Sequence, residues 1–230
     1  MIEKIDVVTL TYEKLAKTID HAMLRAYFTR EMIKEGCELA LKYQVATVCV
    51  KPCHVKLCQD ILKGSQVKVA AVVGFPLGGH TPAVKATEAK QVVDNGAEEI
   101  DMVINIGALK DGDYSLVLQE IEEVVKQGVL VKVIIETCYL NEEEKIKACQ
   151  LAEQAGAHYV KTSTGFGSAG AKVEDVKLLY EKVAPRLGVK AAGGISSLSK
   201  ALVMIEAGAT RLGTSATRTI MEEWEATHEK

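Results

Sequence analysis

Short apolar segments recur along the whole chain, separated by longer amphipathic stretches. Eight segments rich in Val, Ile and Ala are predicted to be strands, at residues 17–24, 45–50, 67–73, 98–104, 131–136, 157–162, 188–193 and 209–214. This regular alternation is typical of parallel strands joined by helical crossovers. Eight such units in 230 residues favour a single (β/α)8 TIM barrel, with an open, doubly wound α/β sheet as the alternative. No G-x-G-x-x-G motif opens a helix after the first strand, which argues against a dinucleotide-binding form of that alternative.

Helix boundary signals in the intervening stretches support this interpretation. Thr81 is a predicted N-cap, Pro82 follows it at the first helical position, and Gly96 comes after the last apolar residues of the same stretch. Asn141 and Glu144 have the spacing of a capping box. Because no linker or low-complexity tract interrupts the alternation, we expect one domain over residues 1–230.

Composition and charge limit the partners. Hydrophobic residues make up 48% of the chain and charged residues 26%, as in ordinary globular proteins. The net charge of −3 gives no basis for binding nucleic acid or an anionic membrane. No apolar run is long enough to span a bilayer, and the N-terminus lacks a secretory pattern. The six cysteines are irregularly spaced and do not indicate a disulfide framework, so we expect a cytoplasmic protein.

Three charged residues occupy unusual positions inside the apolar strands. Successive strand residues point to opposite faces, so Asp101, Lys161 and Lys190 are each predicted to point into the barrel. Ligands of TIM barrels bind at the C-terminal ends of the strands, which is where these residues lie. The alternative interpretation is that the three are structural ion pairs or solvated lysines.

Two lysines and one carboxylate suit amine chemistry. A free lysine has a pKa of about 10.4, and burial together with a neighbouring cation lowers that value. A neutral amine can attack a carbonyl to form a Schiff base, and the protonated imine then withdraws electrons from a breaking C–C bond. An aspartate beside the amine can transfer protons directly or through a water.

Glycine-rich loops predict a second ligand group. Barrels often bind phosphate with the loops that follow their seventh and eighth strands. The candidate residues are Gly165, Gly193, Gly194, Gly213 and Ser215. Glycines in such turns also occur for purely conformational reasons.

Several longer motifs carry a family resemblance. The stretches EIDMVINIGALK, VKVIIETCYL, YVKTSTGF and VKAAGG resemble deoxyribose-phosphate aldolases almost word for word, and VVGFPLGG, IDHAML and AGATRLGTSA fit the same family. The similarity runs from Lys17 to Ala216 in the family's order. It implies a class I aldolase that reversibly cleaves 2-deoxy-D-ribose 5-phosphate to D-glyceraldehyde 3-phosphate and acetaldehyde, with no metal and no organic cofactor.

The resemblance also implies roles for individual residues. Lys161 would form the Schiff base, while Lys190 and Asp101 would donate and accept protons. Asp20 would lie near the substrate hydroxyls, and Cys49 would line the acetaldehyde side. Thr164 would contact the substrate or support the site from behind.

The chain departs from the family pattern at the predicted phosphate end. The family usually continues its glycine pair with an arginine, whereas this chain has GGISS; after the last strand it has GTSATR, with Thr217 at a usual glycine. Arg218 could replace the missing cation, or the change could mark a different substrate. The second hypothesis is therefore an aldolase of the same family that acts on another phosphorylated sugar or aldehyde. The third is a sugar-phosphate-binding protein without catalysis.

Two further features are interpreted from the sequence. Cys49, Cys53, His54 and Cys58 lack the paired spacing of a zinc site, so no metal is expected there. Glu136 is expected either to contact the ligand or to orient a loop. The sequence is compatible with a homo-oligomer, dimeric or tetrameric, and does not decide between them.

Overall fold

Eight parallel strands form a closed barrel at the centre of the computed structural model, which describes residues 2–228. Each strand pairs with its neighbours in chain order, and β8 closes the barrel by pairing with β1. The prediction of a TIM barrel is confirmed, and the alternative of a doubly wound open sheet is wrong. The strands are β1 (Ile19–Met23), β2 (Thr47–Val50), β3 (Lys68–Val73), β4 (Glu99–Val103), β5 (Leu130–Ile134), β6 (Tyr159–Lys161), β7 (Gly188–Ala192) and β8 (Arg211–Thr214).

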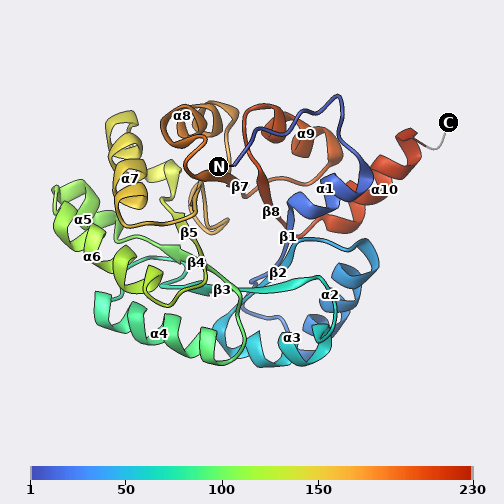
Figure 1. The fold of residues 1–230 in the computed structure, drawn as a ribbon, viewed down its shortest axis with the longest axis horizontal. Helices are drawn as coiled ribbons and strands as arrows, with labels where there is room; N and C mark the ends of the chain where they lie inside the picture. Colours follow the sequence, from blue (N-terminus) through green and yellow to red (C-terminus); the bar gives the residue numbers. More distant parts are fainter. Residues whose placement is uncertain (1, 229–230) are drawn as a thin grey trace.

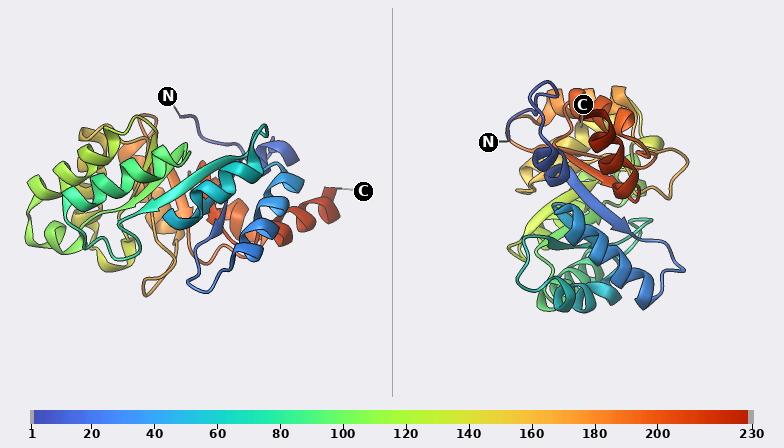
Figure 2. Two further views of the ribbon diagram at one scale, coloured as in Figure 1. Left: turned by 90° about the horizontal axis from the view of Figure 1, so that it is seen from below. Right: turned by 90° about the vertical axis from the view of Figure 1, so that its right-hand side faces the viewer.

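Helices surround the barrel on its outer side (Figure 1). α1 precedes the first strand, and α10 follows the last one and lies beside α1 (Figures 1 and 2). The helices are α1 (Tyr12–Thr18), α2 (Arg30–Tyr43), α3 (Val55–Leu62), α4 (Pro82–Asp94), α5 (Ile106–Asp111), α6 (Tyr114–Val125), α7 (Glu142–Gln154), α8 (Val173–Val183), α9 (Leu198–Glu206) and α10 (Thr217–His228), with 3₁₀ turns η1 (Pro52–His54) and η2 (Thr137–Tyr139). No helix within residues 2–228 combines the length and apolarity needed to cross a membrane.

The predicted helix boundaries are confirmed. The Thr81 side chain accepts a hydrogen bond from the Val84 amide, and α4 begins at the proline that follows it. Asn141 and Glu144 form a complete capping box at the start of α7.

Two helices were not predicted. α1 leads into β1, and α5 follows β4, where the Asn105 side chain caps it and Gly112 ends it in a left-handed conformation. Both are too short for a clear amphipathic period, because they make at most about two turns. Every predicted strand exists, and each differs from its predicted range by two residues or fewer at either end.

The two faces of the barrel strands differ in chemistry. Outward residues such as Ile100, Met102 and Val189 join the main apolar core between strands and helices. Inside the barrel, a small apolar group on the β1–β3 side consists of Leu24, Cys49, Ala70 and Val72. Buried charged side chains also lie in the interior, and the predicted inward direction of the three catalytic candidates follows from this alternation.

Candidate active site

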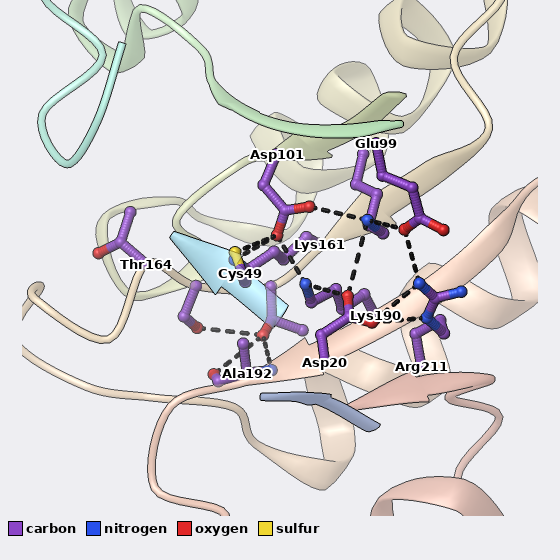
Figure 3. A network of polar contacts seen from close by, with 12 residues as sticks. Asp20, Cys49, Glu99, Asp101, Lys161, Thr164, Lys190, Ala192 and Arg211 are labelled. Atoms are coloured by element: carbon purple, nitrogen blue, oxygen red, sulfur yellow. Dashed lines mark hydrogen bonds and ion pairs between the residues drawn. The ribbon is translucent and has the colours of Figure 1, made fainter. Parts of the chain in front are cut away.

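The carboxylate of Asp101 lies at the centre of the buried charges. Its Oδ2 atom accepts hydrogen bonds from Lys161 Nζ at 2.8 Å and from Lys190 Nζ at 2.6 Å, and its Oδ1 atom accepts one from Lys132 Nζ at 2.9 Å. Asp101 has no exposed surface, and Lys161 is 2% exposed. Figure 3 shows Asp101 reaching toward both Lys161 and Lys190. The structure thus brings together the three residues that strand alternation had selected.

Asp20, on β1, is the second carboxylate of the site. It accepts a hydrogen bond from Lys190, and Arg211 on β8 donates to its other oxygen at 2.9 Å from Nε and lies within 2.8 Å through Nη2. Lys190 therefore bridges the carboxylates of Asp20 and Asp101 (Figure 3). A buried ammonium group between two carboxylates is well compensated, which allows it to remain charged inside the barrel.

A deeper layer of charges supports these residues. Glu99 Oε2 lies 2.5 Å from Lys132 Nζ and accepts a hydrogen bond from Arg211 Nη2 at 2.6 Å. Glu99 lies two residues before Asp101 on the same inward face of β4, and neither Lys132 nor Arg211 was singled out from the sequence. Strand alternation also directs both side chains into the barrel. Lys132 is paired in register with Asp101, and Arg211 with Lys190, so each pair points to the same face.

The charges around these groups set their protonation. Burial by itself would raise the pKa of Asp101, but Lys132, Lys161 and Lys190 hold that pKa well below its usual range. Burial would lower the pKa of Lys190, yet the carboxylates of Asp101 and Asp20 outweigh it and raise the value. Lys190 is therefore a cation, and Asp101 a carboxylate, at neutral pH.

Cys49 lies at the apolar edge of the same site. Its thiol is within 3.9 Å of Asp101 Oδ2. Burial, with a smaller contribution from the Asp101 charge, raises the pKa of the thiol to about 11. Cys49 is thus a protonated, weakly polar wall residue at neutral pH and not a thiolate nucleophile.

A cavity of about 470 Å³ opens above the charges. Of the residues predicted to form the site, all but Asp101 and Arg218 line it. Asp101 lies behind the lysines, fully buried, and Arg218 is an exposed residue on the first turn of α10. The lining residues that were predicted are Asp20, Cys49, Lys161, Thr164, Gly165, Lys190, Gly193, Gly194, Gly213 and Ser215.

The glycine loops form one wall of this cavity. Gly193 and Gly194 both have positive φ angles, and a Cβ atom at Gly193 would lie only 2.9 Å from the Cα atom of Gly170. Other residue types rarely adopt this conformation, so these glycines have a conformational reason to be present. The helices α9 and α10 begin just beyond these loops, an arrangement that suits an anion.

The departures from the family pattern fall at this wall. Ser196 lines the cavity where the family pattern usually has arginine, and Lys200 Nζ donates to Ser196 Oγ at 3.3 Å. Thr217 is turned away from the cavity, because its hydroxyl pairs with His21 Nδ1 at 2.8 Å. The substitution of Thr217 for glycine therefore serves the packing of α10 against β1.

Glu136 follows β5 and faces the loop after β6. Both of its oxygens lie 3.2 Å from the Thr164 amide, and one also accepts a hydrogen bond from the Thr164 hydroxyl. Glu136 is 2% exposed and does not line the cavity. Of the two roles expected for Glu136, the geometry favours orienting a loop.

Aromatic side chains and one cation lie at the cavity mouth. Arg25, in the loop after β1, lies over the ring of Phe166 at 5.3 Å, and Phe166 makes an edge-on contact with Phe75 at 5.4 Å. Arg25, Tyr27, Phe28 and Phe166 all line the cavity. This rim was not predicted, because its residues lie in loops where strand alternation gives no direction.

Potential metal ligands are dispersed in the part of the chain that the structure describes. Within residues 2–228, no group of three or more His, Cys, Asp or Glu side chains is placed to hold a metal ion. Cys53 is exposed, whereas Cys49 and Cys58 are buried.

Known proteins share both the sequence and the fold of this chain. The deoxyribose-phosphate aldolase of Aciduliprofundum boonei is 58% identical over 216 residues, which are 92% of this chain and 97% of that protein. The solved structure of the aldolase QR15 matches with a TM-score of 0.90 at 42% identity and covers 94% of this chain and 97% of its own. The deoxyribose-phosphate aldolase of Aeropyrum pernix, described as a tetramer, matches with a TM-score of 0.88 at 31% identity, over 94% of this chain and 93% of that one.

The family to which these relatives belong also matches most of the chain. The family model of the DeoC/LacD aldolases covers residues 14–223. The chain belongs to the DeoC/LacD family of aldolases and is a carbon–carbon lyase.

Proposed function

We propose that this chain catalyses the reversible cleavage of 2-deoxy-D-ribose 5-phosphate to D-glyceraldehyde 3-phosphate and acetaldehyde through a Schiff base on Lys161. One observation carries the proposal: Lys161 lines the cavity and shares a single carboxylate oxygen, Asp101 Oδ2, with Lys190. The name of the relatives that are more than half identical supports the choice of substrate.

The pair of lysines divides two tasks between them. Lys190 holds a positive charge between Asp20 and Asp101. Lys161, as the neutral amine, attacks the aldehyde carbon of the open-chain sugar. Uptake of one proton and loss of water then give a protonated imine on Lys161, and the same proton is released when water hydrolyses the final imine.

The C–C bond breaks in the next step, and the protons balance as follows. Asp101 takes the proton of the C3 hydroxyl, directly or through a water, the electrons of the C2–C3 bond flow into the imine, and D-glyceraldehyde 3-phosphate leaves. The enamine that remains on Lys161 is neutral, so Asp101 has lost one of its three neighbouring cations and its proton affinity has risen. Asp101 returns this proton to the enamine carbon, with Lys190 relaying it, and water then adds to the imine and releases acetaldehyde.

The cavity offers different surroundings to the two ends of the sugar. Cys49 lies beside Asp101 on the small apolar side of the barrel, which suits the two-carbon fragment. Asp20 is placed near the sugar hydroxyls. Gly165, Gly194 and Ser215 line the opposite wall and would take the phosphate with backbone N–H groups and small side chains.

A second candidate is an aldolase of the same chemistry with another aldehyde as its preferred product. It is favoured by Ser196, which lines the cavity at the position where the family pattern usually has an arginine. Arg218, exposed and outside the cavity lining, does not supply a cation there in this arrangement, although it remains a proposed contact for a larger ligand.

Cleavage of phosphorylated and unphosphorylated deoxyribose separates the two candidates. The released aldehyde is followed with a coupled dehydrogenase under matched conditions. We expect kcat/KM to be at least about a hundredfold higher for the phosphate ester, because several charge-assisted hydrogen bonds are lost without it. Equal values for the two sugars would favour the second candidate.

We also propose that the enzyme is a homo-oligomer, since the Aeropyrum pernix relative is described as tetrameric. Sedimentation velocity at micromolar concentration tests this, and a monomer would contradict it. The cytoplasm is the proposed compartment, because phosphorylated sugars are retained there, and the six free cysteines suit a reducing environment.

A further inference from the structure

Glu136 is a buried charge that the proposed chemistry does not use. It lies directly after β5, and its backbone has a φ angle of 52°, in the left-handed region that residues other than glycine rarely adopt. Strained backbone of this kind persists only where the surroundings enforce it and is frequent at functional sites. The conformation turns the side chain toward the loop that follows Lys161.

The carboxylate of Glu136 binds one residue of that loop at two points. The amide of Thr164 lies 3.2 Å from each carboxylate oxygen, and the Thr164 hydroxyl donates a hydrogen bond to Oε2. The same hydroxyl accepts a hydrogen bond from the Phe166 amide at 3.0 Å. Glu136 therefore fixes the backbone of residues 164–166 through Thr164.

The close packing behind the carboxylate leaves it little freedom. A Cβ atom at Gly167 would lie 2.9 Å from the Cys138 sulfur and 3.1 Å from the Glu136 carboxyl carbon. The loop after β6 thus folds back over Glu136, and the carboxylate is shielded from the cavity.

The fixed segment forms a wall of the cavity. Thr164, Gly165 and Phe166 all line it, whereas Glu136 does not. A Cβ atom at Gly165 would lie 3.9 Å from the Cα atom of Gly193, so the segment borders the glycine pair after β7. Glu136 acts on the end of the cavity proposed for the phosphate, not on the reacting carbon atoms.

We propose that Glu136 is a positioning residue that holds residues 164–166 in the conformation that binds the phosphate end of the substrate. The inference rests on the proposed function for the identity of that substrate. Burial raises the pKa of Glu136, so an ionised carboxylate at this place opposes folding at neutral pH. Because its charge lowers the stability of the fold, the role of Glu136 is better explained by its hydrogen bonds to residues 164–166 than by a contribution to folding.

Kinetics with paired substrates tests the proposal. We expect Glu136→Ala to raise KM for 2-deoxy-D-ribose 5-phosphate about tenfold, with kcat little changed, because the lost hydrogen bonds disorder the phosphate wall. Glu136→Gln keeps an acceptor for the Thr164 amide and is expected to show a smaller rise. KM for unphosphorylated deoxyribose and acetaldehyde trapping on Lys161 are expected to stay at parent levels in both variants. Glu143→Ala, an equal change of charge at an exposed position of α7, is the control.

Two kinetic results would overturn the proposal. One is a fall in kcat at unchanged KM, which would place Glu136 in the proton transfers. The other is an equal rise in KM for the two sugars. Thr164→Val combined with Glu136→Ala adds a further check, since two residues that act through one contact are expected to give less than additive effects.

Hydrogen exchange tests the loop without any substrate. The peptide covering residues 162–168 is expected to exchange faster in Glu136→Gln than in the parent, while peptides from β7 and α9 are unchanged. Unchanged exchange in residues 162–168 would contradict the proposal. If the parent does not cleave the phosphorylated sugar, the proposed function fails, and this measurement still decides whether Glu136 holds the loop.

Discussion

Asp101 is the single residue that balances most of the positive charge in the active site. Three lysines donate hydrogen bonds to its two oxygens. Among the ion pairs of residues 2–228, Lys161 contacts no carboxylate besides Asp101. Each buried ammonium group is costly without a partner. The carboxylate that offsets the cost of burying the lysines therefore also lies beside the proposed Schiff-base amine, where protons are transferred.

Substituting Asp101 is expected to separate adduct formation from turnover. Asp101→Asn retains the shape of the side chain but loses the charge, so we expect kcat for cleavage of the phosphorylated sugar to fall by about 10²–10⁴. Acetaldehyde trapping on Lys161 is expected to persist, because the amine of Lys161 and not the carboxylate forms the bond to the aldehyde.

The matched control is Glu99→Gln, the same change one layer deeper, where the carboxylate contacts Lys132 and Arg211 but not Lys161. We expect a smaller loss of kcat in this variant. A kcat for Asp101→Asn within about threefold of the parent would contradict a role in proton transfer, since general acid–base catalysis contributes far more.

Strand alternation was sufficient to predict the three central residues but not the whole network. Asp101, Lys161 and Lys190 lie at inward positions of short strands whose direction is fixed by period two. Lys132 and Arg211 obey the same rule but were not singled out from the sequence. Which carboxylate oxygen each cation contacts depends on the stagger of the closed barrel, which a single strand does not reveal.

A buried ion pair between two helices, α4 and α6, supports β4, the strand that carries Asp101. Lys85 on α4 and Glu120 on α6 are both fully buried, with Nζ and Oε2 2.6 Å apart. Lys85 also donates to the carbonyl of Val103, and Glu120 accepts from the amide of Asn105, so the pair satisfies the backbone at the end of β4. The end of β4 is thereby fixed two residues beyond Asp101.

Breaking this pair is expected to be strongly destabilising. Lys85→Met leaves a buried, unpaired carboxylate, and we expect the free energy of unfolding to fall by about 3–5 kcal/mol. The exposed pair Lys90–Asp94, on the same helix, provides the control: Lys90→Met is expected to cost less than about 1 kcal/mol. Urea unfolding followed by circular dichroism measures both variants, and equal costs would contradict the account.

Elements with strong local signals were the most predictable ones. The capping box of α7 and the Thr81–Pro82 start of α4 follow from side chains that satisfy the first amides of a helix. α5 escaped prediction because it is held by Asn105 and Gly112 at its two ends and not by an apolar period. The aromatic rim around Arg25 and Phe166 depends on loops from different units and could not be derived from local pattern.

Closure of the barrel brings the first and last strands together. β1 pairs with β8, and His21 on β1 pairs with Thr217 at the start of α10. Burial lowers the pKa of His21 to about 4, so the ring is neutral in the folded protein near pH 7. The folded pKa lies below that of an unfolded chain, about 6.5.

This difference predicts a loss of stability in mild acid. Unfolding takes up a proton at His21 below pH of about 6.5, so the stabilisation from the neutral ring is complete above that value and is lost as the pH falls toward 4. Between pH 7 and pH 5 we expect the free energy of unfolding to fall by about 2 kcal/mol from this residue. His21→Gln removes the titration, so its loss over the same interval is expected to be smaller by that amount. Equal pH dependence of parent and variant would contradict the assignment.

Chemical trapping tests whether Lys161 is the residue that forms the Schiff base. The protein is incubated with acetaldehyde, reduced with borohydride, digested and mapped by tandem mass spectrometry, in parallel with Lys161→Leu. We expect an ethyl group on Lys161 in the parent, none at position 161 in the variant, and no cleavage activity in the variant. An active parent whose Lys161 remains unmodified, or whose ethyl group lies on Lys190 instead, would contradict this role of Lys161.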